Sequence, residues 1–356
     1  MILSQYLSRL FLTRTLAALL VFASLLQLLD LLDNASTVLA RGGGAGELVH
    51  YASLRLPMIV ERVIPLAVLV GSLLTLWSLA QHNEVVALRA AGLTPYRLVG
   101  ILMPAALVVA ATHFLVADQI APRSERAFLD WWAATAPDAD AEPSDQHRIW
   151  MRVSGTVVAA DRMRDRGRTL DGVLIFRRDA SGRITSRIEA ERATYENGVW
   201  TLYKGDSFAI NDAGASHAAF DSQTWDAPLS PANVLDVASP PENISQAKLS
   251  NILHGTWSGT QSPAYYRTRL YGGYSGPLAS LIMVLLAAPV AHGVRRRGTM
   301  MGGLVIGVVA GLLFLVFNGL MMALGEANIV PAMLAAWAPT LIFSAFAGAV
   351  MVHLEG

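Results

Sequence analysis

Arginine supplies almost all of the positive charge in this sequence. Of 27 basic residues, only Lys204 and Lys248 are lysines, and there is no cysteine. The planar guanidinium group binds phosphate through two parallel hydrogen bonds, so these residues favour the binding of anions. The lack of cysteine excludes disulfide bonds and cysteine metal sites.

Residue types that serve in catalysis are present, but they lack the spacing of an active site. His147, His217 and His254 are scattered, without the spacing of metal ligands. Neither Gly-x-Ser-x-Gly nor a Walker A motif occurs, so the chain cannot itself hydrolyse ATP by the usual means. We therefore predict no catalytic residue, no metal site and no cofactor bound by this chain. The formal net charge of zero gives no reason to expect nucleic acid as a partner.

Most of the chain consists of apolar segments. Hydrophobic residues make up 53% of it, charged residues 15%, and the mean hydropathy is +0.43. Since about 20 apolar residues cross a bilayer, we predict six membrane spans, three on each side of a polar middle. The predicted spans are Leu10–Leu32, Pro57–Ala80, Leu98–Ala117, Gly276–His292, Gly302–Leu324 and Pro331–His353.

Arginines in the short loops predict the orientation of these spans. If the N-terminus is cytoplasmic, the arginines gather on the cytoplasmic side, and the polar middle of the chain lies outside. Both termini are then cytoplasmic. The arginines on the cytoplasmic side are Arg9, Arg14, Arg89, Arg97, Arg295, Arg296 and Arg297.

The polar middle, residues 118–270, has the pattern of an all-β domain. It contains strand-length runs, several of which alternate apolar with polar residues, and an Asn-Gly hairpin signal at 197–198. Such a pattern favours a sandwich, a jelly roll or a partly open barrel. The runs are Arg148–Val153, Thr156–Ala160, Gly172–Arg177, Ile184–Glu191, Val199–Lys204, Ser207–Ile210 and Ser222–Trp225.

Together these patterns predict an α+β membrane protein with three plus three transmembrane helices and an inserted all-β domain on the outer side, with a jelly roll among its possible forms. Residues 1–117 and 271–356 would form the helices, and residues 118–270 the domain with its linkers. The apolar residues that we expect inside the domain are Ile175, Trp200, Leu202 and Phe208.

A short amphipathic helix is predicted at residues 81–92, between the second and third spans. Asn83 is a suitable N-cap, Gly92 ends the pattern and Pro95 prevents its extension. On the cytoplasmic side, such a helix suits docking into a nucleotide-binding subunit, although it could also simply join two spans. The residues expected at the docking surface are Glu84, Val85, Leu88, Arg89 and Gly92.

Three arginines lie on the outer side of the predicted spans, where they could bind an anion. Arg41 and Arg55 lie near the ends of the first two spans, and Arg62 lies just inside the second. The alternative for Arg62 is an ion pair with Glu61 or an interfacial position. Asp30 would be costly facing lipid, so we expect it to face a cavity or a partner.

The order of all these parts resembles the LptF/LptG family of permeases, which export lipopolysaccharide. Residues 84–92, the three-plus-three spans and the β insert match over nearly the whole chain. Residues 189–202 resemble the family's jellyroll repeat, with an alanine pair, an aromatic residue, a turn and Trp-x-Leu. The ends of the first two spans, at residues 28–33 and 78–81, look more like the LptG branch.

This resemblance implies a multi-pass protein of the bacterial inner membrane with a set of partners. These are the sister permease LptF, two copies of the ATPase LptB, which would use ATP and Mg, the single-span LptC, the bridge protein LptA, and lipopolysaccharide. In the family, spans one and five line the lipid cavity and meet the sister subunit. The positions implied for the cavity are Leu28, Leu31, Phe314 and Phe317.

One feature of the family is missing. Lysines near the outer end of the first span meet lipid phosphate in the family, whereas this sequence has Asp30, Ser36 and Thr37 there. That role is therefore not carried over. The resemblance still implies a lipid headgroup site, and the nearest cations on the outer side that could form it are Arg41, Arg55 and Arg62. Two other functions stay open at this point: the sister permease LptF, and a membrane-anchored periplasmic lipid-binding or regulatory protein without an ATPase partner.

Overall fold

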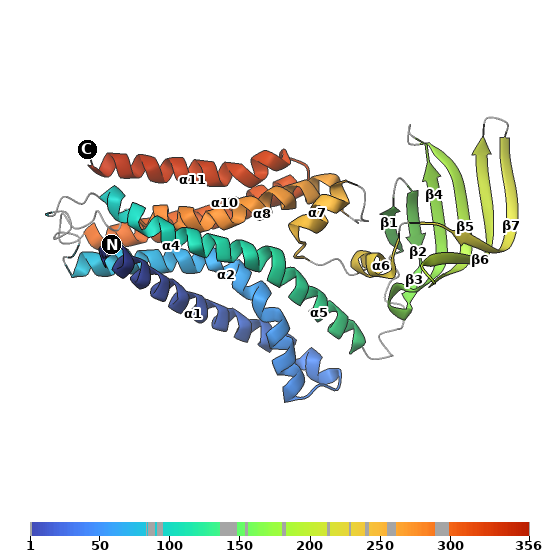
Figure 1. Ribbon diagram of the computed structural model, residues 1–356, viewed down its shortest axis with the longest axis horizontal. Helices are drawn as coiled ribbons and strands as arrows, with labels where there is room; N and C mark the ends of the chain where they lie inside the picture. Colours follow the sequence, from blue (N-terminus) through green and yellow to red (C-terminus); the bar gives the residue numbers. More distant parts are fainter. Residues whose placement is uncertain are drawn as a thin grey trace. The chain divides into compact units, whose positions relative to one another are not determined.

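The computed structural model divides the protein into a helical unit and a β unit (Figure 1). The helical unit contains Met1–Trp131 and Ala264–Gly356, and the β unit contains Trp132–Pro263. The structure describes residues 2–82, 84, 90, 95–135, 148–153, 156–179, 183–211, 214–227, 229–238, 242–254, 261–288 and 299–355.

Six helices within these described ranges are long and apolar enough to cross a membrane. The predicted fold class, six apolar helices with an inserted all-β unit, is therefore confirmed. Helix α4 continues through a π-helical turn, Val116–Ile120, into α5, Ala121–Ala134. The six helices start from α1 (Ile2–Ala40), α2 (Ala45–Gln81), α4 (Pro95–Leu115), α8 (Pro263–Ala287), α10 (Thr299–Glu326) and α11 (Ala332–Glu355).

The fourth span begins earlier than the sequence predicted. Helix α8 starts at Pro263 rather than near Gly276, and Pro277 lies inside it. A proline inside a membrane helix is tolerated because neighbouring helices compensate for the lost backbone bond. Arg269 lies in the polar first half of this helix and forms an ion pair with α10, where its Nε is 2.6 Å from Glu326 Oε1. Residues 118 and 270, the predicted domain limits, therefore fall inside helices.

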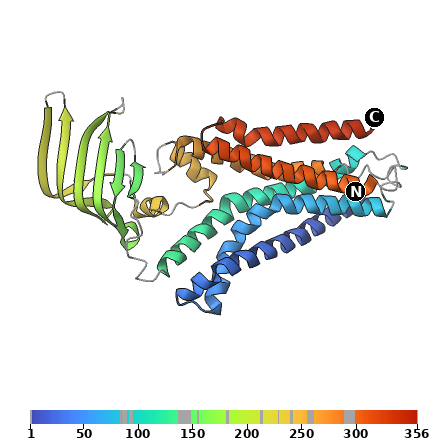
Figure 2. The same cartoon turned by 180° about the vertical axis from the view of Figure 1, so that it is seen from behind.

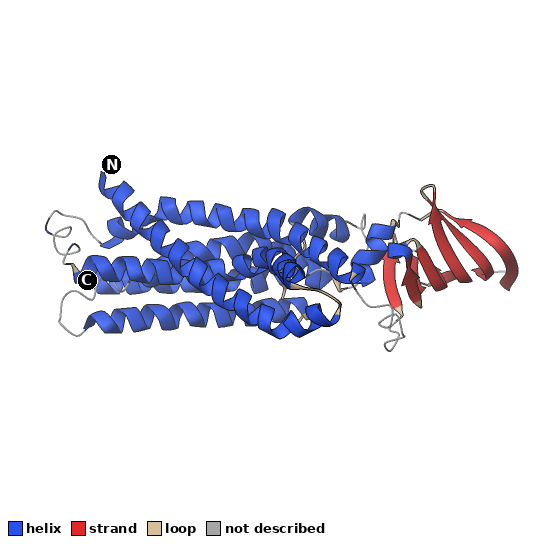
Figure 3. Cartoon of the chain, turned by 90° about the horizontal axis from the view of Figure 1, so that it is seen from below, coloured by secondary structure: helices blue, strands red, loops and turns tan. Residues whose placement is uncertain are grey.

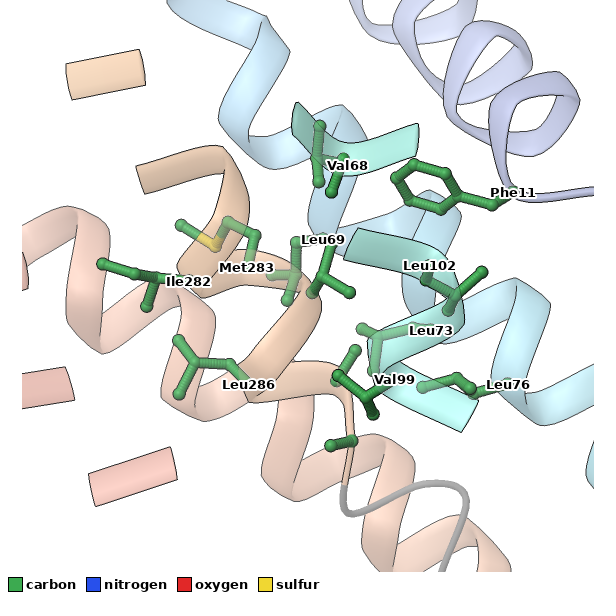
Figure 4. Packing of buried hydrophobic residues seen from close by; sticks show 14 of the residues in the cluster. Phe11, Val68, Leu69, Leu73, Leu76, Val99, Leu102, Ile282, Met283 and Leu286 are labelled. Atoms are coloured by element: carbon green, nitrogen blue, oxygen red, sulfur yellow. The ribbon is translucent and has the colours of Figure 1, made fainter. Parts of the chain in front are cut away.

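Helix α2 is the centre of the helical unit. In its most apolar stretch 72% of the residues are buried, against 17% in α1 and 22% in α10. Figure 4 shows Val68, Leu69, Leu73 and Leu76 of α2 among side chains from α1, α4 and α8. Helices α10 and α11 contact each other at the side of the unit away from α1 (Figure 2). The core is thus built around α2, while α1 and α10 keep most of their apolar surface uncovered.

Glycines allow the close approach of two helices to α2. A Cβ placed on Gly311 of α10 would overlap Leu69, and one on Gly307 would lie 2.6 Å from Leu73. Gly71 of α2 lies against Thr15 of α1 in the same way. Small residues spaced by four are typical of tight helix contacts in membranes. Gly307 and Gly311, four residues apart on α10, therefore serve a contact within this chain.

The β unit contains one antiparallel sheet in which most successive strands are neighbours. The order is β1-β2-β4-β5-β6-β7, and the short β3 pairs with β4. Figure 3 shows that the sheet is strongly curved. The strands are β1 (Ile149–Val153), β2 (Thr156–Ala160), β3 (Arg162–Arg164), β4 (Thr169–Arg178), β5 (Ile184–Glu196), β6 (Val199–Asn211) and β7 (Gly214–Trp225).

One face of the sheet carries a buried core that a short helix closes. Trp200 is fully buried, and its Nε1 donates to the Leu229 carbonyl oxygen at 2.7 Å. Val234 and Val237 of α6, Pro231–Ala238, pack into the same cluster. A second short helix, α7, covers Gln246–Leu253.

An aligned irregularity, which we call the crease, crosses four neighbouring strands. The strand pairing skips Gly172 on β4, Glu191 on β5, Lys204 on β6 and Asp221 on β7. Gly172 and Lys204 have φ values of +61° and +47°. The skipped residues lie opposite one another, and the register of the pairs is the same on both sides of them. The alternation of core residues nevertheless shifts by one, since Leu170 and Val173 both belong to the core, as do Ala190 and Ala193. The core face therefore continues from Leu202 to Gly205, three residues on, instead of following strict alternation.

The crease corrects one strand prediction. Val199–Lys204 and Ser207–Ile210 were expected as two strands, but they are parts of β6. Lys204 is an exposed residue in a left-handed conformation, and pairing with β5 resumes at Gly205. The polar stretch at 204–206 resembles a turn in sequence, although the chain passes through it without reversing.

Candidate functional site

Three side chains form a polar cluster between α1 and α2. Arg55 of α2 donates to both carboxylate oxygens of Asp30 on α1, with distances of 2.8 Å to Oδ1 and 3.3 Å to Oδ2. The Tyr51 hydroxyl donates to Asp30 Oδ2 at 2.9 Å. Tyr51 and Arg55 are four residues apart, so they lie on one face of α2 and reach the same carboxylate. Asp30, which we expected to face a cavity or a partner, thus binds two side chains of its own chain.

Aromatic residues of α5 surround this cluster. The Arg55 guanidinium carbon lies 5.4 Å from the centre of the Phe128 ring. The Tyr51 ring packs against Phe128 edge-on at 5.6 Å, and Trp131 Nε1 donates to Glu47 of α2 at 3.1 Å. A guanidinium over an aromatic face is attracted by the ring quadrupole. Arg55 is thus held from two sides, by a carboxylate and by a ring.

Arg62 lies seven residues after Arg55, two turns further along the same face of α2. Its side chain is exposed. Glu61, which was considered as its ion-pair partner, lies 3.8 Å from Nε2 of the buried His113. Arg41, the third predicted cation, is half-buried after the end of α1. The structure therefore offers Arg62 as the most exposed of the three arginines.

The residues implied for the lipid cavity differ in their exposure. Leu28 of α1 is 54% exposed, while Leu31 and Phe317 are half-buried. Phe314 is fully buried and packs edge-on against Phe343 of α11 at 5.3 Å. Leu28 thus contributes to the uncovered face of α1, whereas Phe314 packs α10 against α11 in the interior of the helical unit.

The predicted docking segment lies mostly outside the described residues. Glu84 is helical and half-buried. Its predicted companions Val85, Leu88, Arg89 and Gly92 are not among the residues that the structure describes.

In the β unit, three of the four predicted interior residues belong to the buried core. Ile175, Trp200 and Leu202 are fully buried there. Phe208 is 37% exposed and lies beside His217, with ring centres 4.6 Å apart. It follows the crease, where the side-chain alternation has shifted by one residue, and this shift turns it away from the core face.

Sequence comparison identifies the relationship of the chain. Residues 5–353 match the family described as lipopolysaccharide export system permease LptF/LptG. The chain belongs to the LptF/LptG family. The LptG protein of Escherichia coli (strain K12) is 26% identical over 348 residues, which cover 96% of this chain and 95% of that protein. The LptG protein of Haemophilus influenzae is 25% identical over 300 residues, covering 83% of this chain and 82% of that protein.

Membership of the LptF/LptG family confirms the resemblance drawn from the sequence, including its LptG character. Its members are permease components, and the six apolar helices agree with a multi-pass inner-membrane protein. Within the described ranges, no group of three or more His, Cys, Asp or Glu residues is placed to hold a metal ion. The side chains that the fold brings together are instead those of Asp30, Tyr51, Arg55 and Phe128. Sequence reasoning missed this pairing because no local spacing connects residues 30, 55 and 128.

Proposed function

We propose that this chain is the LptG-type permease of an ABC transporter that extracts lipopolysaccharide from the outer leaflet of the inner membrane. The β unit would then receive the lipid and pass it toward the outer membrane. The observation that carries this proposal is the family match over residues 5–353, which includes both the helices and the β unit.

The uncovered faces of α1 and α10 support this function. Leu16, Leu20 and Leu28 on α1 are all more than half exposed, as are Leu313 and Val316 on α10. A lipid with several acyl chains needs a wide apolar wall, and a partner permease would use the same kind of surface. Arg62 and Arg41 supply positive charge for the lipid phosphates at the outer side. Arg55 is available only when Asp30 releases it.

The energy for transport would come from other subunits. We expect no cofactor to bind this chain, and two copies of the ATPase LptB to use ATP and Mg at the segment around Glu84. The sister permease LptF would complete the lipid cavity, while LptC and LptA would carry the lipid onward. Both termini would be cytoplasmic and the β unit periplasmic.

A purification tests this function directly. The tagged full chain, expressed in its own host and extracted in mild detergent, should retain an ATPase, a second permease and lipopolysaccharide, all identified by mass spectrometry. Purification of the chain with lipid but without any ATPase would contradict the transporter and favour a regulatory lipid-binding protein. Retention of an ATPase with a phospholipid instead of lipopolysaccharide would contradict the proposed substrate.

A further inference from the structure

Asp30 and Arg55 form an ion pair whose two members each keep a second contact. Asp30 also accepts the hydroxyl hydrogen bond of Tyr51, and Arg55 also lies over the Phe128 ring. The side chains are partly exposed, 17% for Asp30 and 26% for Arg55. The pair is therefore reachable from outside the helical unit.

We propose that Asp30 is a specificity-determining residue that competes with the phosphate of the transported lipid for Arg55. In the empty protein the Asp30 carboxylate is paired with the Arg55 guanidinium group. In the loaded protein a lipid phosphate takes the place of the carboxylate. This inference rests on the proposed function, since it assumes a phosphorylated lipid as substrate.

The second contacts make such an exchange possible. When a phosphate displaces Asp30, the Phe128 ring still holds the guanidinium group of Arg55 in place. The released carboxylate still accepts from Tyr51, so it is not left without a hydrogen bond. Carboxylate and phosphate both bind a guanidinium group through two parallel hydrogen bonds, so one can replace the other without moving the arginine.

The position of Arg62 gives the exchange a direction. It lies two turns from Arg55 on the same face of α2, and its side chain is exposed. A lipid phosphate attracted by Arg62 therefore arrives next to the Asp30–Arg55 pair. The competition lowers the affinity for every phosphorylated lipid. The loss is larger for a lipid with a single, poorly positioned phosphate than for a lipid whose phosphates reach both Arg55 and Arg62. The competition also allows the lipid to be released, because Asp30 can pair with Arg55 again and displace the phosphate.

The test measures lipid binding by the full chain, purified with the subunits that it retains in dodecyl maltoside. The probes are fluorescent lipid A with two phosphates and the same lipid after removal of its phosphates. We expect Asp30→Asn to bind the phosphorylated probe about tenfold more tightly, or by about 1.4 kcal/mol. It should bind the dephosphorylated probe as the unaltered protein does. The matched control is Asp33→Asn, since Asp33 is exposed on the next turn of α1 and should change neither affinity.

Two further variants separate competition from a structural role. Asp30→Asn should bring no gain in an Arg55→Ala background, because the competition acts only through Arg55. Tyr51→Phe should weaken binding of the phosphorylated probe about threefold, or by about 0.6 kcal/mol, since it removes the contact that Asp30 keeps after the exchange. If the Asp30–Arg55 pair only stabilised the fold, all these variants would lower the melting temperature and weaken the binding of both probes.

Each outcome has one meaning. Unchanged or weaker binding of the phosphorylated probe by Asp30→Asn overturns the competition, while lipid binding by the unaltered protein leaves the proposed function standing. If the unaltered protein binds neither probe, the proposed function itself fails. Inorganic phosphate should displace the phosphorylated probe only at high concentration, and equal potency of free phosphate would show an anion site unrelated to lipid.

Discussion

Arg62 is the exposed member of the arginine pair on α2, and we expect it to make the first contact with lipid phosphate. Replacing it by alanine should weaken lipopolysaccharide loading about tenfold, because a charge-assisted hydrogen bond contributes roughly 1.5–3 kcal/mol when it is partly desolvated. The basal ATPase rate of the complex should change much less. Arg62→Lys should restore only part of the loading, since an ammonium group lacks the planar fork. Photo-crosslinking of bound lipopolysaccharide measures the loading.

The control for Arg62 is Arg126→Ala, which removes an exposed arginine of α5. It should leave loading unchanged. Normal loading by Arg62→Ala together with a lower melting temperature would instead give Arg62 a structural role, and the headgroup cations would then have to come from Arg55, Arg41 or the sister permease.

At this scale the sequence predicts which residue types matter but not their partners. Arg55 and Arg62 look equivalent in sequence, yet Asp30 occupies Arg55 and leaves Arg62 more exposed. The difference depends on how α1 packs along α2, where Thr15 lies against Gly71 and a buried cluster joins Ala18 and Ala23 to Val63 and Ala67. No local pattern around residues 55 or 62 contains this information.

Among the helices, the contact of α10 with α2 depends on two glycines. Gly311→Leu should destabilise the helical unit by about 1–3 kcal/mol, because the new side chain overlaps Leu69. Gly319→Leu on the same helix is the control, as a Cβ there meets nothing within 4 Å. Thermal unfolding in detergent measures the difference. Equal melting temperatures for the two variants would show that α10 does not pack tightly on α2.

The β unit shows why alternation alone misplaces a residue. Strict alternation along 199–210 puts Phe208 on the same face as Trp200, but the crease at Lys204 shifts the pattern by one residue. Ile175 and Trp200 lie in segments that the crease leaves intact, and both are fully buried. A positive φ at a lysine has no signal in the sequence, because this conformation is set by the neighbouring strands.

The corrected alternation predicts where lipid contacts the sheet. Ser207 and Ala218 are paired on the core face beyond the crease, and Ala218 is exposed there. Phe208 and His217 are paired on the opposite face. A photo-crosslinking residue at Ala218 should capture lipopolysaccharide when ATP is supplied, and one at His217 should not. Capture at His217 in preference to Ala218 would place the lipid on the other face.

For the whole molecule, the sequence predicted the two kinds of unit because their periodicities differ strongly. Long apolar runs can only form helices in a membrane, and short alternating runs form strands. The limits of the units were harder to place, since α5 and α8 continue as helices through polar stretches. Hydropathy indicates which residues lie in the membrane, whereas the end of a helix is set by where its backbone hydrogen bonds end.

Transport by the whole molecule requires that ATP hydrolysis outside the chain moves the helices within it. Glu84 is half-buried and lies three residues after Gln81, the last residue of α2. This is the end of α2 predicted to be cytoplasmic, and α2 forms the centre of the core. Glu84→Lys should reverse the charge presented to the ATPase and lower lipopolysaccharide-stimulated ATP hydrolysis about tenfold, as expected for the loss of a charge-assisted contact. Gln81→Lys, which adds a positive charge three residues earlier at an exposed position, should have a much smaller effect. Membrane insertion and the melting temperature should be the same for both variants. Full stimulation in Glu84→Lys would show that the movement enters the helical unit elsewhere than at the end of α2.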